Sequence, residues 1–292
     1  MQTTSDCARP QGAPERRGIL FMLGGTACIV CNDALIKFAS QSMPLSQLMF
    51  VRACFGTIFL LAIVSYTRTP LHVASLGQVR VVARAALDVA GTLAYVVGLA
   101  YLPLANVTAV AMSSPLVITL LAILLYRERV SATRWRAMFV GLCGVLLIVQ
   151  PASNSFNAWS LLVLLSVVLI ASRDMVTRAI SKDISSLVLT LIATLLVVIG
   201  SGAWGLTENW RPLDWRQIGM LALASMLLSS GYIFTTISIR EAPVGVVAPF
   251  KYSSLIVSSM LSYLVWDQIP NPLAWLGIAL TMSAGIYLVR RR

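Results

Sequence analysis

Charged residues, histidine and long polar stretches are scarce in this sequence. Only 11% of the 292 residues are charged, whereas soluble domains carry roughly 25%. The hydrophobic share is 58%, and the mean hydropathy is +0.84. No long polar stretch follows the N-terminal tail, so no segment is available for a separate soluble domain. This composition excludes an ordinary soluble protein and indicates one that lies in a membrane.

The sequence also lacks the residues that metal, redox and nucleotide sites require. Its single histidine is His72, and it contains no glycine-rich phosphate-binding loop. Cys28 and Cys31 have the spacing of a metal or redox pair, but no second cysteine pair accompanies them. We interpret both as small apolar packing residues. The sequence therefore predicts no metal site, no cofactor and no ATP-driven cycle.

Long apolar runs, by contrast, follow one another along the whole chain. Runs of about 20 apolar residues are typical of membrane-spanning helices, and turn residues fill the short connections. The tail, residues 1–17, carries no cleavable signal peptide, so the first span is expected to direct insertion. We expect an all-α polytopic membrane protein with ten spans, at about 18–39, 45–66, 80–100, 104–126, 135–150, 158–178, 186–206, 215–238, 246–266 and 272–289.

The basic residues orient these spans. If the N-terminus is cytoplasmic, the outer loops hold only Arg211 and Arg216. The inner segments then hold Arg9, Arg16, Arg17, Arg68, Arg80, Arg127, Arg129, Arg134, Arg136, Arg178, Lys182, Arg240, Arg290, Arg291 and Arg292. Because basic loops stay on the cytoplasmic side, both termini are expected there. The net charge of +11 then reflects topology and contact with anionic lipid headgroups, so no nucleic-acid partner is expected.

The two halves of the chain resemble each other. At an offset of 141 residues, Asp33 aligns with Asp174 and Lys37 with Arg178, and an offset of 139 extends the match to the later spans. Repeats with an odd number of spans have inverted topology, which provides two facing states of similar energy. The repeats hold five spans each and cover residues 18–150 and 158–289.

The connections and late helices of each half resemble a known family. The segments YVVGLAYLPLANVTAVAMSSPLVITLLAILLYRERV and APVGVVAPFKYSSLIVSSMLSYLVWDQIPNP resemble the end of an EamA repeat of the drug/metabolite transporter superfamily. Their sequence is similar to that of the subgroup that includes riboflavin and S-adenosylmethionine transporters. The resemblance implies ten helices in two inverted repeats around a central cavity, in the inner membrane of a bacterium. Asp267 departs from the pattern, because the family usually has glutamate there.

Ionisable residues inside the membrane are the candidates for gating or coupling, because each is costly unless it is paired or hydrated. Asp33 and Lys37, like Arg84 and Asp88, are four residues apart. Either each couple forms an ion pair on one helix face, or its members exchange partners as a gate. Helix direction divides these residues into an outer set, Asp33, Lys37 and Arg52, and an inner set, Arg84, Asp88, Arg173, Asp174 and Lys251.

Lys251 is the leading candidate for solute contact, because no acid lies within four residues of it along the chain. Tyrosines beside polar groups stack on planar solutes, although core positions are the alternative for them. Close helix packing is likewise the alternative for the serines that follow Lys251. Pro115 removes a backbone hydrogen bond within the fourth span and is the expected hinge. The candidate substrate-binding residues are Lys251, Tyr252, Asp88, Tyr95, Ser113 and Ser254.

These features predict a secondary transporter that moves a small polar metabolite by alternating access. The mixed signs of the membrane charges favour a zwitterionic or heterocyclic solute, such as a vitamin, a nucleoside-like or an amino-acid-like molecule, with protons or a counter-solute as the coupling partner. A membrane-embedded enzyme is one alternative, but the sequence lacks the nucleophile–base or metal constellation it needs. A receptor or scaffold that transports nothing is the other. The chain is expected to act as a monomer or dimer.

Overall fold

The computed structural model describes residues 12–68, 78–126, 132–149, 157–178, 180, 184–242, 247–268 and 271–290. Within these residues the secondary structure is helical throughout, without a strand. Its elements are α1 (Gly12–Ala39), α2 (Leu45–Tyr66), α3 (Val79–Tyr101), α4 (Leu104–Ala111), α5 (Ser114–Tyr126), α6 (Ala132–Val149), α7 (Trp159–Arg178), α8 (Ser186–Gly205), α9 (Trp215–Glu241), the 3₁₀ helix η2 (Ala248–Tyr252), α11 (Ser253–Trp266) and α12 (Pro272–Arg290).

Six of these helices, α1, α2, α3, α7, α8 and α9, are long and apolar enough to cross a membrane. Shorter apolar helices occur in α4 to α6 and in α12. Large apolar side chains such as Leu20, Leu124 and Phe139 are exposed, whereas polar ones such as Asn32 and Ser166 are buried. This distribution is the reverse of a soluble protein, and it confirms the predicted class of all-helical, multi-pass membrane protein.

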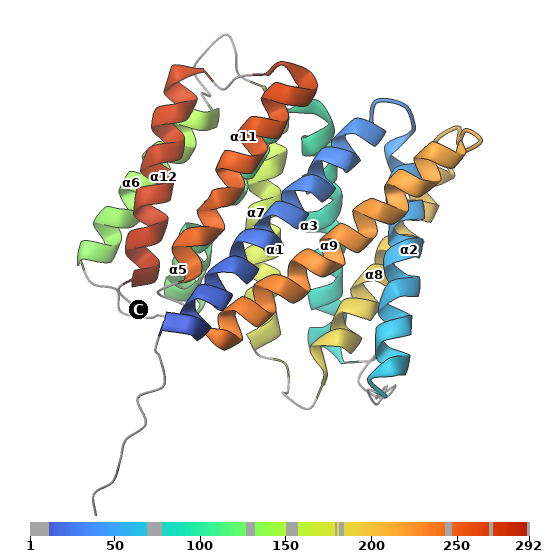
Figure 1. Ribbon diagram of the computed structural model, residues 1–292, viewed down its shortest axis with the longest axis horizontal. Helices are drawn as coiled ribbons and strands as arrows, with labels where there is room; N and C mark the ends of the chain where they lie inside the picture. Colours follow the sequence, from blue (N-terminus) through green and yellow to red (C-terminus); the bar gives the residue numbers. More distant parts are fainter. Residues whose placement is uncertain are drawn as a thin grey trace, which may run out of the picture.

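The helices pack as a set of side-by-side pairs. Figure 1 shows α1 and α9 crossing the view diagonally beside each other, with α2 next to α8 and α6 next to α12. The remaining large contact joins α3 to α7. Buried residues from most of these helices form one core cluster, which includes Ile36, Leu99, Val163 and Leu221.

Contacts between α1 and α3 show that these two helices run in the same direction. Asp33 contacts Tyr95, and Lys37 contacts Leu99, so both contacts join residues that are 62 apart in the chain. A constant separation along two helices arises only when the helices are parallel.

Contacts between α3 and α7 show the opposite relation. Asp88 contacts Arg173, 85 residues later, while the earlier Arg84 contacts the later Thr177, 93 residues away. A separation that grows toward the start of α3 means that α3 and α7 are antiparallel. Since α1 is parallel to α3, the helices α1 and α7, which begin the two halves of the chain, run in opposite directions.

Two glycines set the distance at equivalent helix crossings in the two halves. A Cβ atom built on Gly91 of α3 would lie 2.9 Å from Cγ1 of Ile170 on α7. A Cβ atom built on Gly231 of α9 would lie 2.7 Å from Cγ1 of Ile29 on α1. Ile29 and Ile170 are related by the offset of 141 residues found in the sequence. The same residue types therefore make the same close contact twice.

The fourth span is interrupted rather than continuous. A single helix was predicted for residues 104–126, and this prediction is wrong at Met112 and Ser113, which form a turn between α4 and α5. The amide of Ser113 donates to the carbonyl of Val110, one residue short of the α-helical partner. Pro115 explains the break, because proline has no N–H to donate to the carbonyl of Ala111.

The ninth predicted span, 246–266, is interrupted at the equivalent place. Its first turn is the 3₁₀ helix η2, which contains Pro249 and ends at Tyr252, and α11 follows from Ser253. Lys251 and Tyr252 align with Met112 and Ser113, so the two interruptions coincide in the sequence repeat.

The other predicted spans agree with the structure to within a few residues, except that α1 begins at Gly12. Glu15 in its first turn favours this earlier start, because an acid stabilises a helix N-terminus. Asp267 ends α11 in the left-handed conformation, with a φ of 55°. Glu128, His72 and the side chains of Pro115 and Arg178 lie outside the described residues.

Candidate functional site

The polar side chains inside the bundle form two groups. We call Asn32, Asp33, Arg52 and Tyr95, from α1, α2 and α3, the α1 cluster. We call Arg84, Asp88, Arg173 and Asp174, from α3 and α7, the α7 cluster. Because α3 contributes to both, the two clusters lie along one helix, about two to three turns apart.

The α1 cluster surrounds a carboxylate that is bonded by neutral donors. The hydroxyl of Tyr95 donates to Oδ2 of Asp33 over 2.7 Å, and Nδ2 of Asn32 donates to Oδ1 over 2.9 Å. Arg52 lies within electrostatic range of this carboxylate but forms no ion pair with it. Asp33 is buried, and each of its oxygens accepts a hydrogen bond, one from its neighbour on α1 and one from α3.

Lys37 does not pair with Asp33, although the two lie one turn apart on α1. Its Nζ donates instead to the carbonyls of Leu99 and Leu102 at the end of α3. The same ammonium lies over the ring of Trp266, 5.5 Å from the centroid. The carbonyls that end a helix attract a cation, which explains why this partner replaces the predicted one. Lys37 thus joins α1 to α3 and α11.

Arg173 is the centre of the α7 cluster. Its Nη1 lies 2.5 Å from Oδ1 of Asp88, and its Nη2 lies 2.8 Å from Oδ1 of Asp174. Nε of the same side chain also donates to Asp174, over 3.0 Å. One guanidinium therefore pairs with two carboxylates and joins α7 to α3.

Arg84 does not pair with Asp88, so the second predicted ion pair is also replaced. Its Nε donates to the hydroxyl of Thr177 over 3.0 Å, and its Nη1 donates to the carbonyl of Leu189 over 2.9 Å. Arg84 therefore bridges α3 to α7 and α8, while Asp88 forms its ion pair with Arg173.

The two clusters repeat one detail of geometry. In the first half, Asn32 donates to Oδ1 of the aspartate that follows it, Asp33. In the second half, Arg173 donates to Oδ1 of Asp174 in the same way. The two pairs are 141 residues apart, so the sequence repeat corresponds to a repeated contact.

Lys251 is exposed in the last turn of η2 and lies within electrostatic range of Asp174. In the described part of the chain, no hydrogen bond or ion pair reaches its Nζ. Lys251 is therefore positioned to contact water or a solute beside the α7 cluster.

The other predicted substrate-binding residues at the helix interruptions are buried within the bundle. Tyr252 is buried, and its hydroxyl has no hydrogen-bond partner among the described residues. Ser113 donates to Val110 within its own turn. Ser254 contacts the sulfur of Met112 at 3.6 Å. Ser254 therefore joins the two interrupted helices, and Tyr252 and Ser254 are buried although they are neighbours of the exposed Lys251.

Exposure increases from one cluster to the other. Asp33 is 7% exposed, whereas the side chains of Asp88, Arg173 and Asp174 are 15%, 23% and 41% exposed. Lys251 beyond them is exposed as well. We call the polar groups from Asp33 through Asp88 and Arg173 to Lys251 the polar path; among them Asp33 is the least accessible, and Asp174 and Lys251 are the most accessible.

Sequence reasoning missed Tyr232 of α9. Its ring is 58% exposed, and it lies within electrostatic range of Asp33, Arg52, Asp88 and Arg173. Tyrosine is common in membrane helices, and no charged residue lies within seven positions of Tyr232 on α9, so nothing in the local sequence distinguishes it.

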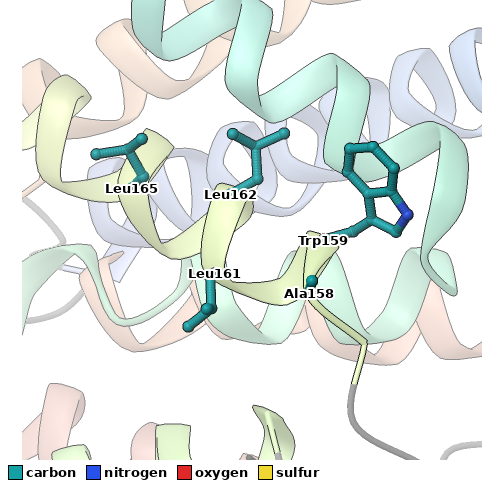
Figure 2. Close-up of a pocket in the computed structure, with 5 residues that line it drawn as sticks. All are labelled: Ala158, Trp159, Leu161, Leu162 and Leu165. Atoms are coloured by element: carbon teal, nitrogen blue, oxygen red, sulfur yellow. The ribbon is translucent and has the colours of Figure 1, made fainter.

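An apolar hollow at the start of α7 is separate from both clusters. Figure 2 shows it lined by Ala158, Trp159, Leu161, Leu162 and Leu165. The indole of Trp159 is stacked on Tyr101, with the centroids 4.3 Å apart. No charged group lines this hollow, so it lacks the polar contacts that would bind a polar solute.

Comparison with known proteins gives consistent matches over the whole chain. A model of the EamA-like transporter family matches residues 16–150 and again 157–291. A riboflavin transporter of Rhizobium johnstonii is 28% identical over 71% of this chain and 68% of its own. The pseudopaline exporter CntI of Pseudomonas aeruginosa is 24% identical, over 95% of this chain and 97% of its own.

Two further matches extend the comparison. An S-adenosylmethionine uptake transporter of Rickettsia bellii is 24% identical over 93% of both chains. A solved crystal structure covers 94% of this chain and 98% of its own with a TM-score of 0.61 at 17% identity, which shows a common fold.

Proposed function

This chain belongs to the EamA-like transporter family, and we propose that it is a secondary transporter that moves a small polar or zwitterionic metabolite across a bacterial inner membrane by alternating access. The observation that carries the proposal is the polar path between the two clusters. It contains charges of both signs inside an apolar bundle, and these groups are more accessible toward Lys251 than at Asp33. Such groups are expensive in a membrane, and they are retained where a solute or ion passes.

Inverted repeats of five spans each supply the two states that this mechanism needs. Four observations support them: the opposite directions of α1 and α7, the paired glycine crossings, the repeated aspartate contact and the coinciding helix interruptions. Interrupted helices at corresponding positions of two halves are typical of solute sites in transporters. On this basis the ten apolar segments are ten spans.

The conformation described here corresponds to a cytoplasm-open state. The basic loops favour cytoplasmic termini, and this orientation puts the Lys251 end of the path on the cytoplasmic side. Lys37 closes the opposite end by joining α1 to α3 and α11. Exchange of these contacts is the gating step, with Asp33, Lys37 and Arg52 at one end and Arg84, Arg173 and Asp174 at the other.

The solute is expected to contact Lys251, Asp88 and Arg173, which combine an accessible cation with an ion pair. The named relatives transport riboflavin, pseudopaline and S-adenosylmethionine. Riboflavin and S-adenosylmethionine both contain a planar heterocycle, which favours a heterocyclic solute here. Protons or a counter-solute are the coupling partners, and Asp33 is the carboxylate best isolated from cations to accept a proton.

Reconstitution into liposomes tests this function. Purified protein is incorporated into vesicles, and uptake of riboflavin, S-adenosylmethionine, nucleosides and amino acids is measured with and without a preloaded counter-solute or a pH gradient. We expect saturable accumulation or exchange of at least one solute, absent from protein-free vesicles. A folded protein that moves none of these classes under any gradient would contradict the proposal.

A further inference from the structure

Tyr232 occupies an unusual position in the bundle. Its side chain is 58% exposed, yet it lies within electrostatic range of charged groups on four other helices. These are Asp33 and Arg52 of the α1 cluster, and Asp88 and Arg173 of the α7 cluster. Charged groups of both clusters therefore act on its hydroxyl.

The register of α9 points this tyrosine toward the inside. Gly231 makes the close crossing with α1, so the side chain of the next residue leaves α9 beside that crossing. Ser225 lies two helical turns earlier on the same face of α9, and its hydroxyl donates to the carbonyl of Arg52 over 2.9 Å. A face that contacts α2 and approaches both clusters borders the interior. The exposure of Tyr232 is therefore exposure to the polar path.

Tyr232 differs from the other tyrosine of the path. The hydroxyl of Tyr95 is occupied by Asp33, and its ring is packed against the core. Tyr232 offers an accessible ring face. An aromatic face flanked by acids and guanidinium groups suits a planar ring that carries charged substituents, because the ring stacks while the substituents pair with the flanking charges.

We propose that Tyr232 is the stacking platform of the solute site and selects solutes that contain a planar heteroaromatic ring. The inference rests on the transport function proposed above and adds a specificity-determining residue to it. Asp33 and Arg52 of the α1 cluster and Asp88 and Arg173 of the α7 cluster all lie within electrostatic range of the platform. Aliphatic zwitterions can pair with the same charges but gain nothing from the ring.

Two substitutions separate the ring from the hydroxyl. Tyr232→Phe retains the ring, whereas Tyr232→Leu removes it, and Tyr263→Leu is the matched control at an exposed tyrosine of α11. Dissociation constants are measured by calorimetry on the purified full chain, with riboflavin and S-adenosylmethionine as ring solutes and with lysine and glycine betaine as aliphatic ones. Tyr232→Met provides a second ring-free variant if Tyr232→Leu does not fold.

We expect Tyr232→Leu to weaken binding of the ring solute by about tenfold or more, because stacking of a base on an aromatic side chain contributes roughly 1–3 kcal/mol. Tyr232→Phe and Tyr263→Leu should leave the dissociation constant of the ring solute within about threefold of the wild-type value, a smaller change than the one expected for Tyr232→Leu. Ring-solute binding that Tyr232→Leu and Tyr232→Met leave unchanged would overturn this inference while the transport function stands. A wild-type protein that binds the aliphatic solutes and neither ring solute would overturn the inference too. A wild-type protein that binds and transports no solute would overturn both.

Discussion

The hydroxyl of Tyr95 donates a 2.7 Å hydrogen bond to Oδ2 of Asp33, and so joins α3 to α1 in the buried part of the bundle. In the other cluster the corresponding connection is ionic, from Arg173 to Asp88. The two ends of the polar path are therefore held by different chemistry. The closed end uses a neutral donor and a lysine bound to backbone carbonyls, while the open end uses an ion pair with partly hydrated groups.

The contact between Tyr95 and Asp33 is expected to be energetically coupled. Tyr95→Phe removes the donor and Asp33→Ala removes the acceptor, and the double variant completes a cycle of unfolding free energies measured in detergent. We expect a coupling energy of about 0.5–1.5 kcal/mol, the range for hydrogen bonds between membrane helices. Strictly additive losses would show that the bond contributes nothing to stability.

Exchanging Asp33 and Lys37 is expected to abolish transport. The two residues do not pair with each other, so the exchange would place a carboxylate against the carbonyls of Leu99 and Leu102 and an ammonium beside Tyr95. Protein yield, melting temperature and vesicle uptake are the measurements. Normal uptake by the exchanged variant would mean that the couple serves only to balance charge within α1.

Glycine-to-alanine substitutions should destabilise the protein at the close helix crossings and not at helix positions with open space. Gly231→Ala places a Cβ atom 2.7 Å from Ile29 and 2.9 Å from the carbonyl of Gly25, so the helices must shift. We expect it to reduce the free energy of unfolding by about 1–3 kcal/mol, as overpacking does. Gly91→Ala should behave in the same way, because it makes the equivalent contact with Ile170.

The controls for these variants are Gly56→Ala and Gly219→Ala, since a Cβ atom at either position meets no atom within 4 Å. Both lie in helices, where alanine is favoured over glycine by about 1 kcal/mol. Thermal unfolding of the four variants should therefore divide them into two destabilised and two neutral or stabilised proteins. Equal melting temperatures across the set would contradict the close crossing.

Lys251→Ala is expected to weaken solute binding by about tenfold or more without loss of fold, because a hydrogen bond to a charged group contributes about 1.5–3 kcal/mol. The side chain is exposed and makes no contact that the described residues would lose. Calorimetric titration reports the affinity, and melting temperature reports the fold. Wild-type affinity in this variant would remove Lys251 from the site.

The fold was predictable from the sequence to the extent that apolar runs specify helices. The runs located the helices that the structure describes, because backbone groups in lipid must be satisfied within the segment. The interruption at Met112 and Ser113 was not located. Pro115 was recognised, but a proline in a helix is compatible with a kink as well as a break, and only the packing of α4 and α5 against other helices decides between them.

The candidate site was predictable in its members and not in its contacts. Asp33, Asp88 and Arg173 were identified because charge within an apolar run is rare. Their partners were not, because the rule that residues four apart interact considers one helix only. In the bundle, the end of α3 supplies Lys37 with carbonyls, and a second helix supplies Asp88 with a guanidinium. Tyr232 had no sequence signal at all, since its role depends on charges from four other helices.

The break before Pro115 also determines what a mutational scan of this protein would report. The carbonyl of Ala111 has lost its helical donor, because the residue four positions later has no N–H. This acceptor belongs to the main chain, so replacing the side chains around it leaves it in place. Alanine substitutions of the charged groups of the path would therefore leave this acceptor unchanged, whereas replacing Pro115 with alanine restores a donor to that carbonyl.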